Sequence, residues 1–167
     1  FKGSLVPRFF EQPDAVECPP VKEATALADR AGAIAAYAYL GDVGESPTGD
    51  KKAEKYEDEW LDELFENLPG LGFRAVTYMP PRNTKEQLAR VKSLCERHGL
   101  MEISGVDINS SRQEFRCPEV NLPEFRHLND RTWALIAHEH LASHGGPGLF
   151  DAESPLKDAP LEIRLDI

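Results

Sequence analysis

The sequence predicts an α/β protein whose strands run parallel. Three apolar runs, at residues 33–39, 73–79 and 101–106, have the length and composition of strands that are covered on both faces. A segment with helical periodicity precedes each run. The interval from residue 73 to residue 101 has the length of a βαβ unit, which implies a right-handed crossover and parallel strands.

The composition limits the class of protein. With 167 residues, 41% of them hydrophobic and 29% charged, the chain has the make-up of a single domain, residues 1–167. The formal charge of -10 argues against a nucleic-acid partner and against anionic membranes, because phosphate contacts need clustered Lys and Arg. Cys18, Cys95 and Cys117 form no C-x-x-C pair, so we expect neither disulfides nor a zinc knuckle. No run reaches the roughly 20 apolar residues of a membrane helix. Together these features predict a cytoplasmic protein.

The first two predicted helices follow from local start and stop signals. Pro19 and Pro20 begin a helix whose apolar stripe ends at Gly32, and the chain before it is expected to be irregular. A polar loop, residues 41–55, leads to a second helix, residues 56–68. The acidic residues of that region are Glu54, Glu57, Asp58, Glu59, Asp62 and Glu63. We interpret them as a solvated helix face; the alternative is a site for a cation or a basic partner.

Two further helices are predicted in the second half. Asn83 followed three residues later by Glu86 has the spacing of a capping box, and a helix then extends to Gly99 with Cys95 on its buried face. Asp130 is expected to cap a last helix, residues 131–144. The apolar residues expected on its buried side are Trp133, Ile136, Ala137 and Leu141. Residues 147–167 lack periodicity and are interpreted as a tail.

Three histidines lie on the last predicted helix. His140 and His144 have the i, i+4 spacing that can place two imidazoles on one metal ion, and His138 precedes them. The sequence lacks the second histidine of H-E-x-x-H, so that protease motif is excluded. The alternative to a metal site is a packed or hydrogen-bonded histidine.

Polar residues follow each predicted strand. They are Tyr39 and Asp42 after the first strand, Arg82 after the second, and Asp107, Asn109, Ser110 and Arg112 after the third. Ligands of α/β proteins bind beyond the carboxyl ends of the strands, so these residues are the first candidates for a site. Carboxylates hold hard cations, and guanidinium groups bind phosphate or carboxylate through two hydrogen bonds. In the alternative interpretation the polar residues after the third strand cap a turn, and the arginines pair with acidic neighbours.

Three motifs resemble a known family. They are Ala31-Gly-Ala-Ile-Ala-Ala-Tyr-Ala-Tyr-Leu-Gly41, Gly72-Phe-Arg-Ala-Val-Thr-Tyr-Met-Pro80 and His98-Gly-Leu-Met-Glu-Ile-Ser-Gly-Val-Asp-Ile-Asn109. Together they resemble the C-terminal half of the PHP (polymerase and histidinol phosphatase) superfamily, over residues 19–113. Members of that superfamily are distorted, TIM-like β/α barrels that bind metal ions and mostly hydrolyse phosphate esters. The resemblance implies that this chain is the C-terminal part of such a barrel, which an N-terminal segment or another chain would complete.

The resemblance assigns a role to some residues and departs at others. Asp107 stands where the family has a metal-binding aspartate, and Asn109 stands where it has a histidine. Tyr39 also stands at a family histidine, and the family's N-terminal His-x-His motif is absent from this chain. An amide nitrogen offers no lone pair to a transition metal, and a neutral phenol is a weak ligand.

Two functions follow as hypotheses, and the sequence leaves open whether the chain is an enzyme. The first is a metal-dependent phosphoesterase that acts on a small phosphorylated molecule with zinc, manganese or iron. In it Asp107 and Asn109 bind metal, Asp107, Arg112 and Arg82 are catalytic, and Tyr39, Asp42 and Ser110 bind substrate. The alternative is a catalytically degenerate PHP-like module that binds an anionic ligand or a partner protein. A sugar-binding or isomerase-type barrel would share the architecture alone.

Overall fold

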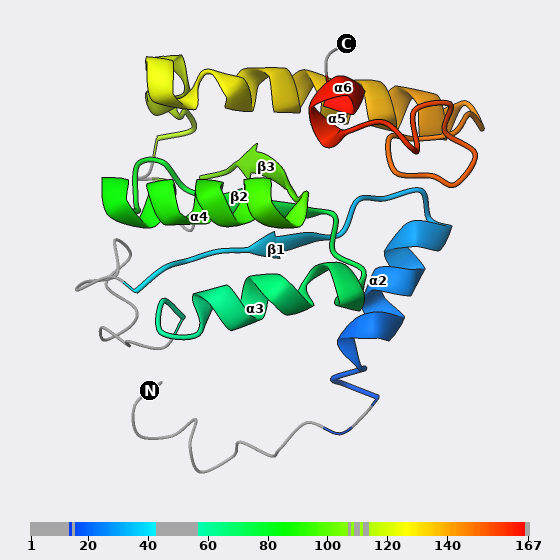
Figure 1. Ribbon diagram of the computed structural model, residues 1–167, viewed down its shortest axis with the longest axis horizontal. Coiled ribbons are helices and arrows are strands. Elements are labelled where there is room, and N and C mark those ends of the chain that lie inside the picture. Colours follow the sequence, from blue (N-terminus) through cyan, green and yellow to red (C-terminus); the bar gives the residue numbers. More distant parts are fainter. Residues whose placement is uncertain are drawn as a thin grey trace.

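The computed structural model describes residues 14, 16–42, 57–106, 108, 111 and 114–165. Its centre is a parallel sheet of three strands, β1 (Ala36–Ala38), β2 (Ala75–Tyr78) and β3 (Met101–Ser104), in the order β1-β2-β3 (Figure 1). The register places Ala36 beside Ala75, and Ala75 beside Met101. The prediction of an α/β protein with parallel strands is therefore confirmed. Within the described residues the sheet is open and does not close into a barrel.

A helix precedes each strand and a longer helix follows the last strand, as the sequence predicted, whereas the helix at Leu161–Leu165 lies in the predicted tail. The α-helices are α2 (Val21–Arg30), α3 (Leu61–Asn67), α4 (Lys85–His98), α5 (His127–Ser143) and α6 (Leu161–Leu165). Short 3-10 helices are η1 (Pro69–Leu71), η2 (Pro118–Asn121) and η3 (Pro123–Phe125). The strands are shorter than the apolar runs, although Tyr39 N–H still donates to the Thr77 carbonyl at 2.9 Å beyond the end of β1.

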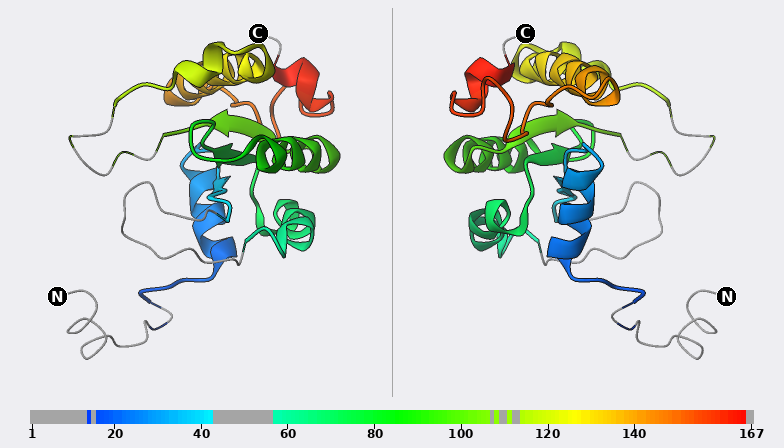
Figure 2. Two further views of the ribbon diagram at one scale, coloured as in Figure 1. Left: turned by 90° about the vertical axis from the view of Figure 1, so that its left-hand side faces the viewer. Right: turned by 90° about the vertical axis from the view of Figure 1, so that its right-hand side faces the viewer.

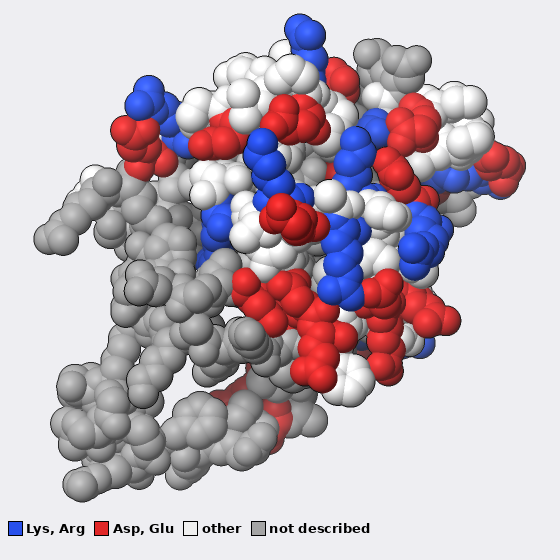
Figure 3. Space-filling view, turned by 60° about the vertical axis from the view of Figure 1, so that its left-hand side comes forward, with Lys and Arg blue, Asp and Glu red and all other residues white. Residues whose placement is uncertain are grey.

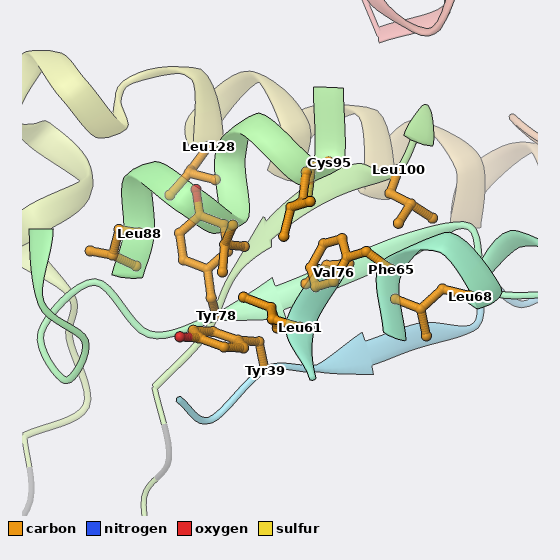
Figure 4. Packing of buried hydrophobic residues seen from close by; sticks show 12 residues of the cluster. Tyr39, Leu61, Phe65, Leu68, Val76, Tyr78, Leu88, Cys95, Leu100 and Leu128 are labelled. Atoms are coloured by element: carbon orange, nitrogen blue, oxygen red, sulfur yellow. The ribbon is translucent and has the colours of Figure 1, made fainter. Parts of the chain in front are cut away.

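Alternate residues of the strands enter two separate cores. α3 and α4 lie on the same side of the sheet (Figure 2). On that side Val76 and Tyr78 pack among the apolar residues of both helices, and Cys95 lies in the same core, as predicted (Figure 4). On the opposite face Ala75 and Met101 pack against α5, α6 and the chain between them. This alternation follows from the two-residue period of a strand.

The capping box of α4 lies one residue later than the sequence predicted. Thr84 is the N-cap: its hydroxyl accepts the Gln87 N–H at 3.2 Å, and the Gln87 side-chain oxygen accepts the Thr84 N–H at 2.9 Å. The predicted cap residue, Asn83, instead donates to the Leu40 carbonyl at 2.8 Å. The prediction that Asn83 and Glu86 form the capping box was wrong, because the Asn83 side chain is hydrogen-bonded to Leu40, a residue distant in sequence.

We expect Thr84→Ala to lower the free energy of unfolding by about 1 kcal/mol, because it leaves a helix N–H without its acceptor. Glu86→Ala is the matched control, and we expect it to change stability by less than about 0.5 kcal/mol, as for exposed residues in general. Urea denaturation of both variants measures the difference. An equal loss in the two variants would contradict the observed cap.

Helix α5 differs from the prediction in its start and in its buried side. It begins at His127, without a side-chain cap, because η3 leads into it almost directly, and Asp130 lies in its first turn. The buried positions are Leu128, Ala134 and His138. Three of the four residues predicted to form the buried stripe are exposed, at 67% for Trp133, 49% for Ile136 and 47% for Leu141, and Ala137 is half-buried. The predicted stripe was wrong because α5 packs on β3 through the side that carries the small Ala134.

The predicted tail, in its described part, packs into the second core. Leu149 and Leu165 are buried there, and His138 is hydrogen-bonded to Leu149 near the start of this segment. His138 Nδ1 accepts the Leu149 N–H at 2.9 Å, so its proton resides on Nε2, 2.8 Å from the Gly32 carbonyl. This geometry confirms the interpretation of His138 as a hydrogen-bonded structural histidine. His144 lies at the surface, where its Nδ1 is 2.7 Å from the His140 carbonyl oxygen.

The three cysteines are free thiols, as predicted: Cys18 is exposed, Cys95 buried and Cys117 half-buried. None of the helices in the described part of the chain has the length and apolar character needed to cross a membrane.

Candidate functional site

The described residues include three of the seven predicted site residues, Tyr39, Asp42 and Arg82. The other four, Asp107, Asn109, Ser110 and Arg112, lie outside the described residues. All three strands are parallel, so their carboxyl ends lie at one edge of the sheet, which we call the strand-end edge. Tyr39 and Asp42 follow β1 at this edge, and Arg82 follows β2.

Asp58 binds three groups at the strand-end edge. Its Oδ1 accepts the Tyr39 hydroxyl proton at 2.6 Å. Its Oδ2 accepts the Asp42 N–H at 3.1 Å and the Gln87 side-chain N–H at 2.7 Å. The carboxylate therefore joins the end of β1 to the first turn of α4.

Glu57 makes a second set of contacts with the same segment. Its Oε1 accepts the Tyr37 hydroxyl proton at 2.5 Å, and its Oε2 accepts the N–H groups of Leu40 at 3.1 Å and Gly41 at 2.7 Å. The Glu57 N–H in turn donates to Asp42 Oδ1 at 2.9 Å. The interpretation of Glu57 and Asp58 as part of a solvated helix face was therefore wrong. Both precede α3 and fix the chain to the sheet, which periodicity within one helix cannot reveal.

Of the other acidic residues in that set, Glu59, Asp62 and Glu63 are exposed, as predicted, and Glu54 lies outside the described residues. Figure 3 shows acidic side chains gathered in one band over α3, below a region of mixed charge. Asp62 is bound by Arg90 and lies 3.7 Å from an Arg97 nitrogen. The hydrogen bond from Arg90 lowers the pKa of Asp62.

Gly41 is the residue that lets the chain turn after β1. Its φ of +70° lies in the left-handed region, which side chains other than glycine rarely adopt. A Cβ at this position would lie 2.6 Å from Asn83 Nδ2 and 2.8 Å from the Tyr39 hydroxyl oxygen. Only glycine therefore lets the backbone approach these two hydrogen-bonded groups.

Tyr39 lacks the metal-binding chemistry of the family histidine at whose position it stands. Its side chain is 1% exposed, and burial, together with the hydrogen bond to Asp58, raises the pKa of its hydroxyl well above the ordinary value. The phenol therefore remains protonated at neutral pH and donates to Asp58 instead of offering an oxyanion to a metal. In the described ranges, no group of three or more His, Cys, Asp and Glu residues is placed to hold a metal ion.

Arg82 has an unsatisfied hydrogen-bond donor. It lies in the turn between β2 and α4, where its backbone N–H donates to the Met79 carbonyl at 2.9 Å. Its side-chain Nε is buried and has no hydrogen-bond partner among the residues that the structure describes. Such a group is costly to leave unpaired, and an anionic ligand would satisfy it.

A second polar cluster lies on the side of the sheet that α3 and α4 cover, around the Tyr78 hydroxyl group. Glu102 of β3 is 6% exposed; it accepts the Tyr78 hydroxyl proton at 2.7 Å, and His127 Nε2 lies 3.3 Å from the same oxygen. Burial acts to raise the pKa of Glu102, but the hydrogen bonds from His127 and Tyr78 outweigh it and hold the pKa below its ordinary value. Glu102 is therefore ionised at neutral pH.

Sequence patterns alone did not predict this cluster. The signal for Glu102 was available, because a carboxylate within an apolar strand needs a buried partner. His127 gave no signal, since it lies before the predicted start of the last helix.

The fold and the site together define an α/β protein with an open parallel sheet, in the described part of the chain, and a polar network at the carboxyl ends of its strands. Comparison with protein-family models gave no match, and comparisons with curated proteins and with solved structures gave none either. The resemblance to the PHP superfamily therefore depends on the three sequence motifs alone.

Proposed function

We propose that this chain is a PHP-like module that binds a small phosphorylated molecule, or an anion of the same chemistry, at the strand-end edge through Arg82. The observation that carries the proposal is the buried Arg82 Nε, which lacks a hydrogen-bond partner in the described residues. A guanidinium group donates two parallel hydrogen bonds to phosphate, and this geometry favours phosphate over a simple halide ion.

The surroundings of Arg82 support this role. Ligands of parallel α/β sheets bind beyond the carboxyl ends of the strands, which is where Arg82 lies. The neighbouring residue, Asn83, is fixed by its hydrogen bonds to Leu40 and Met79. The carboxylates at this edge already accept hydrogen bonds: Glu57 from the chain after β1, and Asp58 from Tyr39 and Gln87. These bonds offset part of their negative charge, which reduces their repulsion of an anion.

Calorimetric titration of the chain with inorganic phosphate and with p-nitrophenyl phosphate tests the proposal. We expect Arg82→Gln to weaken phosphate binding about tenfold, because a hydrogen bond to a charged group is lost. Arg82→Lys should have an intermediate effect, since it keeps the charge but loses the fork of donors. Arg30→Gln is the matched control, because Arg30 is exposed in the last turn of α2. Equal affinities of Arg82→Gln and Arg30→Gln would overturn the role of Arg82.

A metal-dependent phosphoesterase of PHP type is the second candidate. In its favour, the chain leaves the carboxyl end of β3 at the strand-end edge and reaches Asp107 three residues after Ser104. Elemental analysis of protein purified without chelator, together with release of p-nitrophenol from the same ester, distinguishes the candidates. Turnover that requires zinc, manganese or iron and is lost in Asp107→Ala would establish the enzyme. Phosphate binding without turnover would establish the binding module.

We also propose that further strands complete a PHP-type barrel around this sheet, from an N-terminal segment or from another chain. The support is the open sheet of three strands in the described ranges, since exposed strand edges pair readily with other chains. Sedimentation analysis tests this, and a stable monomer of 18.6 kDa would exclude it.

A further inference from the structure

A cavity of about 260 Å³ lies beside α4, and its lining does not include Tyr39, Asp42 or Arg82 of the strand-end edge. Four residues of α4 line it at helical spacing: Lys85, Leu88, Ala89 and Lys92. The opposite wall is formed by Glu124 and Phe125 in η3 and by His127 at the start of α5, and Tyr78 also lines the cavity. The cavity is therefore built from elements that are distant in sequence.

The walls of the cavity combine apolar and cationic groups. Leu88, Ala89 and Phe125 supply apolar surface, whereas Lys85 and Lys92 supply positive charge in a chain whose formal charge is -10. Lys85 Nζ lies 4.0 Å from a Glu124 carboxylate oxygen. Both partners are exposed, so this ion pair is weak. Lys92 forms no ion pair with a described residue, which makes it the better partner for an anion.

Glu102, the buried carboxylate behind the cavity, repels an anion less strongly than a free carboxylate would, because hydrogen bonds offset part of its negative charge. Glu102 accepts the Tyr78 hydroxyl proton and lies within hydrogen-bonding distance of His127 Nε2. Because an ionised carboxylate only accepts hydrogen bonds, His127 Nε2 is the donor in its contact with Glu102. Glu102 thereby fixes the orientation of the imidazole ring, which forms part of the cavity wall.

We propose that this cavity binds a small carboxylic acid anion with an apolar body, its carboxylate against Lys92 and its body against Leu88 and Phe125. A mostly apolar hollow with a few polar groups is the usual form of a small-molecule site. The cavity has a small volume and one lining lysine, Lys92, without an ion pair among the described residues, and these two features select a compact monoanion. The binding surface lies within the described residues and does not involve Arg82.

Titration of the 15N-labelled chain with benzoate, benzamide and acetate, followed by amide chemical shifts, tests the proposal. Benzoate is expected to shift the amides of residues 85–92 and 125–127. Benzamide has the same shape without the charge, so it should bind about tenfold more weakly. Acetate carries the charge without the apolar body, so it should show no saturable binding. Lys92→Gln should weaken benzoate binding to the level of benzamide.

Two further variants sharpen the test. Lys157→Gln removes the same charge from an exposed lysine outside the cavity and should leave benzoate binding unchanged. Ala89→Leu keeps every charge but occupies the cavity, so it should abolish benzoate binding while the amide spectrum still shows a folded chain. Equal binding of benzoate and benzamide, or wild-type affinity in Lys92→Gln or in Ala89→Leu, would overturn the proposal. Phosphate binding through Arg82 is measured separately, so either result can fail without the other.

Discussion

Replacing Gly41 with alanine is expected to lower the free energy of unfolding by roughly 3–4 kcal/mol, a large loss for the addition of a single methyl group. Two causes add. The φ of +70° strains any residue that carries a Cβ. The new Cβ would also lie 2.6 Å from Asn83 Nδ2 and 2.8 Å from the Tyr39 hydroxyl oxygen. Both groups are held by hydrogen bonds, to Leu40 and to Asp58, so they cannot move without breaking a bond.

Gly99→Ala is the matched control for this experiment. Gly99 has a similar φ of +64°, but a Cβ there would meet no atom within 4 Å. We therefore expect Gly99→Ala to cost roughly 1–2 kcal/mol, from backbone strain alone. Urea denaturation of both variants gives the difference, which measures the close approach at the strand-end edge. Equal destabilisation in the two variants would show that the network around Gly41 does not have the described geometry.

Gly148→Ala is expected to destabilise the protein by about 3 kcal/mol, for a different reason. Gly148 needs no left-handed backbone, but a Cβ there would lie 2.5 Å from His138 Nδ1 and would also overlap Cε1. The imidazole cannot retreat, because its two nitrogens are bound to Leu149 N–H and to the Gly32 carbonyl. The substitution should therefore release the segment that follows α5 from the second core.

Gly70→Ala provides the control for Gly148. A Cβ at Gly70 would meet nothing within 4 Å, and its φ is not in the left-handed region. We expect Gly70→Ala to raise the free energy of unfolding by no more than about 1 kcal/mol, because alanine restricts the unfolded chain. Hydrogen exchange at the Leu149 amide should accelerate in Gly148→Ala and remain slow in Gly70→Ala. Unchanged protection of that amide in Gly148→Ala would contradict the role of His138.

The site could be predicted from the sequence only where a local signal marks it. Tyr39, Asp42 and Arg82 were selected because they follow apolar runs, and the structure places all three beyond the carboxyl ends of strands, while their roles in a site stay a prediction. Glu57 and Asp58 were misinterpreted because helical periodicity assigned them to a solvent face. Their hydrogen-bond partners, such as Tyr39 and Gly41, are about 16 to 19 residues away, and no spacing rule connects positions at that distance.

The sequence by itself determined the α/β class, the order of the α-helices and strands as far as α5 and the buried side of α4, since each depends on the period of apolar residues within one element. It also determined the burial of Cys95. Tertiary structure decided the capping residue of α4, the buried side of α5 and the Glu102 cluster. In each of these, a polar or small side chain has its partner on another element, so its role depends on which elements pack together. The cavity beside α4 was likewise decided by tertiary structure, because η3 and α5 complete it from a distant part of the chain.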